Sequence, residues 1–182
     1  MDRRRWFGQL IERYFGVFRK SQRTTMVALA MGLMMRGRAG LAAIARGMQD
    51  DTTVRYRIKR AWRFFSNGRV RCELASQALI QWVCRGNDAP VVLMDWTDLK
   101  DGYQMLAANV ALRRRSVPIG WLVMYKGQFT PKRRSRNDAE EKLILQINEA
   151  MQGRRWILIA DRGFARVDLF RKLKKWKIRY VI

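Results

Sequence analysis

Histidine is absent from the 182 residues of this chain, and its absence excludes several kinds of active site. Ser-His-Asp and Cys-His nucleophile systems, His-containing zinc sites and the HExxH metalloprotease motif all need imidazole. The usual histidine of a tyrosine recombinase is missing as well. Cysteine is nearly absent, with only Cys72 and Cys84 in sequence of helical character. We therefore expect reduced thiols, as in the cytoplasm, and no disulfide framework.

Long apolar runs are also missing. The longest, TTMVALAMGLMM at 24–35, is shorter than the ~20 residues that a membrane-spanning helix needs. It follows charged and aromatic residues, unlike the apolar part of a secretory signal. We interpret this run as a buried helix and expect no association with a membrane.

Acidic residues are scarce: 15 Asp and Glu stand against 38 Lys and Arg, for a net charge of +23. The excess is spread evenly, because residues 1–90 carry 18 − 6 = +12 and residues 91–182 carry 20 − 9 = +11. A folded protein this basic usually has a polyanionic partner. Both halves are therefore expected to contact the phosphate backbone of nucleic acid, although a merely soluble basic surface is the alternative.

The first half of the chain has the periodicity of a helical domain. Apolar residues recur at helical spacing, and Gly, Ser, Asn and Asp positions separate the segments. We expect a helical DNA-binding domain over residues 1–86. Its predicted helices cover about 3–19, 22–35, 39–47, 53–65 and 70–85.

Residues 39–65 predict a pair resembling a helix-turn-helix, with QDDTT (49–53) as the turn that holds the N-cap. Five apolar residues of its second helix share one face: Val54, Ile58, Ala61, Trp62 and Phe65. Arg55, Lys59 and Arg63 lie on another face, and Arg60 is close by. This pattern is typical of a helix that faces DNA. A solvated face of a helical bundle would give the same pattern.

After GNDAP (86–90) the periodicity changes from helical to strand-like. Strands are expected at 91–95, 103–112, 116–125, 156–161 and 178–182, and helices at about 138–152 and 167–176. The order β-β-β-α-β-α-β predicts an α/β domain over 87–182, with an antiparallel meander followed by crossovers into parallel strands. Because the last strand ends flush with the terminus, we interpret it as a cut through a longer domain.

Two of the few carboxylates follow apolar strands, Asp95 in VVLMDWTD and Asp161 in ILIADRGF. Right-handed crossovers place the first and fourth strands side by side and parallel, so these aspartates should meet at one edge of the sheet. Two neighbouring carboxylates repel each other unless a cation neutralises them, and oxygen ligands suit Mg²⁺ or Mn²⁺. We expect two such ions, about 4 Å apart, for phosphodiester displacement. The alternative is that each aspartate only accepts backbone N–H groups at its strand end.

Further basic residues are candidates for contact with the DNA backbone. Those in predicted loops are Arg113, Arg114, Arg115, Lys132, Arg133, Arg134 and Arg136. Arg162 either contacts phosphate beside Asp161 or balances the local charge. Trp121 and Trp156 are expected in the core.

The segments MDWTDLKDGYQMLAANVALRRRSVPIGWLVMY (94–125) and ILIADRGFARVDLFRKLKKWKIRYVI (157–182) resemble the bacterial DDE transposases of the insertion-sequence-four family. That family includes the transposases of the composite kanamycin- and tetracycline-resistance transposons. ARGM (45–48) and RIKRAWRFFSN (57–67) are similar to its N-terminal DNA-binding region. The resemblance covers about residues 25–182, and its most specific parts are the DWTD and DRGF motifs.

The resemblance implies a ribonuclease H-like catalytic fold, with Asp95 and Asp161 as the first and second acids of the triad and Mg²⁺ or Mn²⁺ as cofactor. It implies that double-stranded DNA is cut at transposon inverted-repeat ends and joined to target DNA. The expected assembly is a homodimer in a synaptic complex, on the nucleoid in the bacterial cytoplasm.

The third acid of the family, a glutamate in a Tyr-Arg-x-x-x-x-Glu type of motif, has no counterpart here. Glu140, Glu141 and Glu149 precede the second aspartate and do not match it. We therefore expect a piece of a longer protein or a naturally truncated or processed product. The chain is then either part of an enzyme or a non-catalytic DNA-binding regulator of transposition. A host nuclease with a ribonuclease H-like fold would instead cut without preference for inverted-repeat ends.

Overall fold

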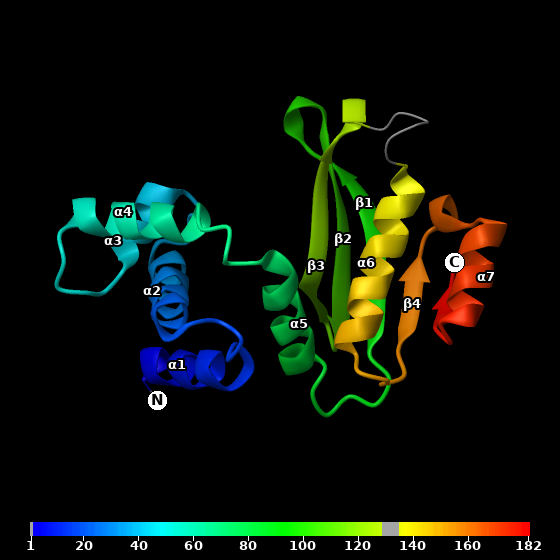
Figure 1. Ribbon diagram of the computed structural model, residues 1–182, viewed down its shortest axis with the longest axis horizontal. Coiled ribbons are helices and arrows are strands. Elements are labelled where there is room, and N and C mark those ends of the chain that lie inside the picture. The colour runs from blue at the N-terminus through cyan, green and yellow to red at the C-terminus, as the bar shows by residue number, and fades with distance from the viewer. Residues whose placement is uncertain (1, 129–134) are drawn as a thin grey trace. The chain divides into compact units, whose positions relative to one another are not determined.

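A computed structural model describes residues 2–128 and 135–182, and the chain divides into two compact units, Met1–Ala75 and Ser76–Ile182 (Figure 1). The first unit is helical and the second contains a mixed sheet, so the predicted α/β class is confirmed. The division lies within helix α5 (Cys72–Val83), earlier than the expected boundary after residue 86. The reason is that Ile80 and Cys84 are buried in the core of the sheet unit.

The helical unit contains α1 (Arg3–Tyr14), α2 (Lys20–Arg36), α3 (Leu41–Gly47) and α4 (Val54–Phe65). These helices agree with the predicted ones to within a few residues at most ends. Thr53 caps α4 by accepting a hydrogen bond from the backbone N–H of Tyr56 at 3.3 Å. The predicted pair at 39–65 is therefore present as α3, a turn and α4.

Helices α2 and α3 touch through their backbones. A Cβ atom on Gly32 would lie 2.3 Å from the carbonyl oxygen of Ile44, and one on Gly47 would lie 2.4 Å from that of Gly32. Only glycine permits this approach, which brings Leu29 of α2 into the core of the unit. The apolar run in α2 is not buried throughout, because Met34 and Met35 near its end are 54% and 57% exposed.

The predicted apolar face of α4 is wrong in part. Ala61 is fully buried, and Ile58 and Phe64 pack against the same core. Val54, Trp62 and Phe65, which were expected on that face, are 39%, 61% and 61% exposed. The helix is turned so that the side of Ala61 and Phe64 faces the core, which leaves Trp62 in solvent.

The sheet of the second unit has the order β3-β2-β1-β4-β5 among the described residues. Its strands are β1 (Val91–Asp98), β2 (Tyr103–Leu112), β3 (Arg115–Tyr125), β4 (Ile157–Ala160) and β5 (Arg179–Val181). Strands β1, β2 and β3 form an antiparallel meander, whereas β4 is parallel to both β1 and β5. The predicted element order and the pairing of the first strand with the fourth are confirmed.

Helices α6 (Arg136–Ala150) and α7 (Val167–Lys175) follow β3 and β4. Their buried apolar residues and Ile80 of α5 form one core with alternate residues of the strands, such as Val92 and Leu158. Figure 1 shows α6 lying along the sheet, where it packs against β2 and β3. Trp156 is buried as predicted, and its Nε1 donates to Asn148 Oδ1 at 3.0 Å.

The other face of the sheet is much more exposed. Strand residues alternate between the two faces, so Leu93, Trp121 and Val123 point away from the core and are 36%, 53% and 53% exposed. The prediction that Trp121 belongs to the core is therefore wrong. The reason is that successive side chains of a strand point to opposite faces, and the next residue, the partly buried Leu122, is the one that packs against the core.

Among the described residues no single helix is both long and apolar enough to cross a membrane. Only α2 and α3 taken together reach the required length and composition, and the two are bent by 97° relative to each other.

Candidate metal and nucleic-acid sites

The pairing of β1 with β4 brings Asp95 and Asp161 to neighbouring positions. The parallel pairing ends with Met94 opposite Ala160, and the two aspartates are the next residue on each chain. Adjacent strands lie about 4.8 Å apart, so these positions are neighbours across the sheet. Asp95 alternates with the buried Met94 and therefore belongs to the face away from the core. Both aspartates are exposed.

The predicted location of Asp95 needs one correction. It was expected at the end of its strand, but β1 continues to Asp98. The extension exists because β1 keeps pairing with β2, from Asp95 opposite Ala107 to Asp98 opposite Gln104. Asp95 thus marks the end of the pairing with β4 and lies inside the hairpin formed with β2.

The two carboxylates differ in their surroundings. Asp161 Oδ1 accepts a hydrogen bond from the backbone N–H of Gly163 at 2.9 Å and caps the short 3-10 helix Arg162–Phe164. The alternative stated above, in which the aspartate accepts a backbone N–H at its strand end, is therefore correct for one oxygen of Asp161. Within residues 2–128 and 135–182, the Asp95 carboxylate has no hydrogen-bond or ion-pair partner. Two neighbouring carboxylates with so few hydrogen-bond and ion-pair partners from the protein suit a hard cation, which prefers oxygen ligands.

A third carboxylate does not join the pair in the described part of the chain, where no cluster of three possible metal ligands occurs. Glu140, on α6, is 3% exposed and accepts from Trp96 Nε1 at 2.9 Å and from Arg166. Glu141 bonds to Arg166 at 3.4 Å and to Lys172. Trp96 alternates with Asp95 and faces the core, so this network lies on the other side of the sheet from Asp95.

Few of the predicted basic residues of the sheet unit lie near the two aspartates. Arg162 directly follows Asp161 and is exposed. Arg136 donates to the buried Gln104 and lies over the Trp96 ring at 5.3 Å, on the core side of the sheet. Lys132, Arg133 and Arg134 lie outside the described residues.

The remaining three, Arg113, Arg114 and Arg115, are exposed at the turn between β2 and β3. Leu112 before this turn is five residues along β2 from Ala107, the partner of Asp95, which is about 17 Å. The structure therefore does not bring these arginines to the carboxylate pair.

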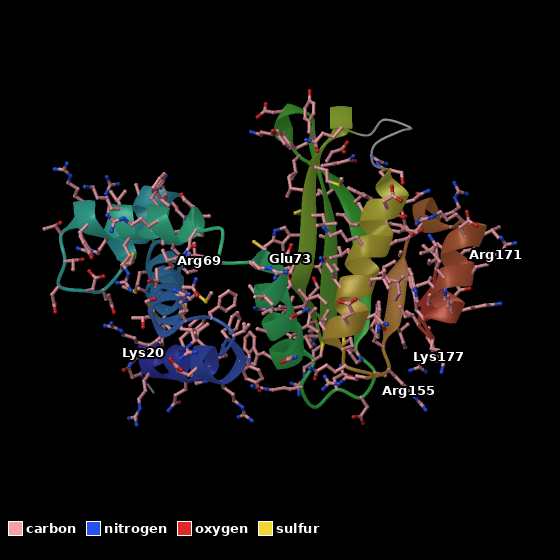
Figure 2. The ribbon with its side chains drawn as sticks, viewed as in Figure 1. Lys20, Arg69, Glu73, Arg155, Arg171 and Lys177 are labelled. Atoms are coloured by element: carbon pink, nitrogen blue, oxygen red, sulfur yellow. The ribbon has the colours of Figure 1, made fainter. Side chains whose placement is uncertain are left out.

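A basic groove that the sequence patterns did not predict lies at the same end of the sheet as that turn. It has a volume of about 460 Å³, and its lining includes Arg154, Arg155, Lys177 and Arg179 but no carboxylate. Figure 2 shows Arg155 and Lys177 extending outward near this end of β4. The sequence does place basic residues just before or at the start of β4 and β5. Because these strands are parallel, their starts lie at the same edge of the sheet.

In the helical unit, α4 carries a basic surface. Arg55, Lys59 and Arg63 are exposed and share a side of the helix, as predicted from their spacing. Arg60 is half-buried instead: its Nε donates to Thr25 Oγ1 and its Nη1 to Asp50 Oδ2, both at 3.2 Å. The structure therefore separates Arg60 from the other three, because its side chain is used within the unit.

Asp50 connects the turn before α4 to the helix. It accepts from Thr52 and lies 3.6 Å from Arg57 Nε and 3.2 Å from Arg60 Nη1. Burial raises the pKa of its carboxyl, but the hydrogen bonds from Thr52 and the charges of Arg60 and Arg57 outweigh it, so the pKa lies below its ordinary value of 3.8. These ion pairs fix the rotation of α4, and with it the direction of the basic surface.

Comparison of the chain with family models, with curated proteins and with solved structures gives no match in any of the three.

Proposed function

We propose that this chain is part of a DNA transposase of the DDE type. In this proposal the helical unit binds transposon ends in double-stranded DNA, and Asp95 and Asp161 hold Mg²⁺ or Mn²⁺ for strand cleavage and transfer. The observation that carries the proposal is the neighbouring position of the two exposed aspartates at the end of the β1–β4 pairing. The order β3-β2-β1-β4-β5 supports a ribonuclease H-like arrangement, which the resemblance of the DWTD and DRGF motifs also implies.

The residues present fit a hard divalent cation. Asp95 offers both carboxylate oxygens, and Asp161 offers the one that does not accept from Gly163. When bound, two ions would activate a water molecule or a 3′-hydroxyl and stabilise the leaving oxygen. The chain itself contributes the rigid spacing of its two ligands, set by the β1–β4 pairing, and positive charge for the flanking phosphates.

The distribution of positive charge suits a duplex that extends beyond the cleaved bond. The groove lined by Arg154 and Arg155 lies at the other end of β4 from Asp161, about 20 Å away by strand geometry. That distance corresponds to roughly six phosphates along one strand. Arg162 would then contact the backbone beside the reacting phosphate. Binding of this kind would place the protein on bacterial DNA, as a homodimer when two ends are joined.

A second candidate is a transposase-derived regulator that binds DNA without cutting it. The observation that favours it is the lack of a third carboxylate beside Asp95 and Asp161 in the described part of the chain. Two carboxylates hold a divalent ion less tightly than three. Both candidates require DNA binding by the helical unit, and only the first requires the metal pair.

Nicking of supercoiled plasmid in Mn²⁺ tests the proposal. We expect Asp95→Asn and Asp161→Asn to abolish nicking and to leave binding of a DNA duplex unchanged, whereas the control Asp98→Asn keeps both. Asp98 is a suitable control because Lys126 already pairs with it at 2.9 Å on the surface. Binding without any nicking would favour the regulator. Nicking that survives both substitutions would show that the active site lies elsewhere.

The metal site has a test that needs no activity. Fe²⁺ bound in place of Mg²⁺ cleaves nearby backbone when ascorbate and peroxide are added. We expect cuts in the segments around Asp95 and Asp161, lost in either Asn variant. Cuts distributed over the whole chain would contradict the site.

A further inference from the structure

Trp62 is exposed at the edge of the basic surface of α4, beside Lys59 and Arg63. Its side chain is 61% exposed, and Arg55, Lys59 and Arg63 are also exposed. Residues 55, 59, 62 and 63 share one side of the helix, with about one turn from Arg55 to Lys59 and about one more from Lys59 to Trp62 and Arg63. A large apolar ring therefore lies beside three cations on one surface.

The helix cannot readily turn to bury this ring. Ala61 and Phe64 hold the opposite side of α4 in the core, and Arg57 and Arg60 are tied to Asp50 at 3.6 and 3.2 Å. Rotating Trp62 inward would expose Ala61 and break both ion pairs. The exposure of Trp62 is thus imposed by the packing of the unit.

A groove borders the same surface. It has a volume of about 410 Å³ between α4 and the first turns of α2. Arg63 and Arg60 line it together with Tyr56 and Ser21, and none of its lining residues is acidic. Arg63 therefore borders both the groove and the side that carries Trp62. Trp62 itself does not line the groove, so Arg63 is the residue that connects the groove to the side of Trp62.

We infer that Trp62 contacts the DNA duplex that α4 binds, by packing its ring against a base edge or a sugar while Arg55, Lys59 and Arg63 neutralise phosphates. This inference depends on the DNA binding in the proposed function but not on the metal pair. The other occupant of such a surface would be a second copy of this chain. Charge argues against that, because α4 contains no acidic residue and each copy carries a net charge of +23.

Salt dependence separates the contribution of the ring from that of the charges. Loss of a phosphate contact lowers the slope of log K against log[salt] by about one unit, whereas loss of an uncharged contact leaves the slope unchanged. We expect Trp62→Ala to weaken binding roughly 5- to 100-fold with the slope of the wild type. Lys59→Ala should weaken binding and lower the slope. The probe is a fluorescein-labelled duplex of mixed sequence in EDTA, titrated by anisotropy over a series of KCl concentrations.

The matched control is Trp6→Ala, which removes a 39% exposed tryptophan from α1 of the same unit and should leave affinity unchanged. Circular dichroism confirms that each variant is folded. Wild-type affinity in Trp62→Ala would overturn the inference, as would a lowered slope. A dimer that Trp62→Ala converts to a monomer, measured by light scattering, would assign the surface to a second copy. If the wild type itself bound no duplex, the proposed DNA binding would fail as well, whatever the Asp95 and Asp161 variants do.

Discussion

Asp50 in the helical unit and Asp95 in the sheet unit are both carboxylates in a very basic chain, yet their surroundings are opposite. Asp50 lies within 3.6 Å of both Arg57 and Arg60 and accepts two hydrogen bonds from Thr52. Asp95 has no such partner among the described residues, and the residue beside it across the sheet is another aspartate. Arginine side chains therefore form ion pairs with Asp50, which has a structural role, and form none with Asp95 or Asp161 among the described residues.

The sheet unit repeats this contrast within itself. Glu140 and Glu141, on the core side, share Arg166, and Lys172 adds a second cation to Glu141. Asp95 lies on the opposite face of the same sheet, and Asp161 directly follows β4 beside it. The two share no basic partner in the described part of the chain. An external cation is the simplest way to neutralise the second pair, so the comparison supports the proposed metal site. It also predicts that the two groups of acids respond differently to substitution.

The largest effect is expected for Glu140→Ala. The substitution leaves Arg166 and Trp96 Nε1 without their acceptor in a place where the glutamate is only 3% exposed. Removing one partner of a buried ion pair costs about 3 kcal/mol of unfolding free energy. Urea denaturation measures it, and Glu149→Ala, on the exposed side of the same helix, is the control. A loss equal to that of the control would show that the network is not a structural one.

A smaller loss is expected for Asp50→Ala, which deprives Arg57 and Arg60 of their shared carboxylate. Because these side chains are partly exposed, we expect the unfolding free energy to fall by about 1–2 kcal/mol. Amide hydrogen exchange should show the loss in α3, α4 and the turn between them. Asp51→Ala, at the exposed neighbour, is the control. Unchanged exchange in α4 would mean that packing of Ala61 and Phe64 alone fixes the helix.

Asp50 also predicts a pH dependence. The pKa of its carboxyl is lowered in the fold, so its stabilising contribution is present above the unfolded value of 3.8 and is lost as the pH falls through the folded pKa. The difference in unfolding free energy between wild type and Asp50→Asn should therefore shrink from about pH 5 downward. Denaturation at a series of pH values measures it. A difference that grows at low pH would mean that the sign of the pKa shift is wrong.

Much of the fold could be predicted from the sequence, because the local patterns were strong. The apolar strand VVLMD and the N-cap at Thr53 both act on neighbouring residues. Right-handed crossovers then fixed β1 beside β4 without knowledge of any tertiary contact. The placement of Asp95 next to Asp161 followed from these local features.

The sequence could not predict which face of an amphipathic helix or strand is buried where more than one face carries apolar residues. Trp62 has the apolar character of a core residue, but Ala61 and Phe64 occupy the core and leave Trp62 in solvent. Arg57 and Arg60 form ion pairs with Asp50 in this orientation of α4. Trp121 likewise lies on the face that the described helices leave uncovered. The burial of Glu140 could have been noticed, since it lies one turn before Leu143 and Ile144 on the apolar side of α6. A charged residue on such a face indicates a buried partner.

The smallest effect on the fold is expected for Asp95→Asn and Asp161→Asn. Without metal, neutralising one of two adjacent carboxylates removes repulsion, so the unfolding free energy should rise or stay within about 0.5 kcal/mol. Asp161→Asn keeps the acceptor for the N–H of Gly163, so it preserves that cap as well. Thermal unfolding without divalent ions measures both, and a large loss in either variant would make that aspartate structural, like Asp50.

Addition of Mn²⁺ should produce a clear difference in unfolding free energy between the wild type and the Asp95 and Asp161 variants. A ligand at ten times its Kd stabilises the folded state by about 1.4 kcal/mol, and the wild type and Asp98→Asn should show this gain. Asp95→Asn and Asp161→Asn should not, because each removes one of the two carboxylates at the site. Equal stabilisation of all four proteins would assign Mn²⁺ to other surface acids. In that case the contrast between Asp50 and Asp95 would reflect only the solvent around an exposed carboxylate, and the β1–β4 pair would lose its proposed role.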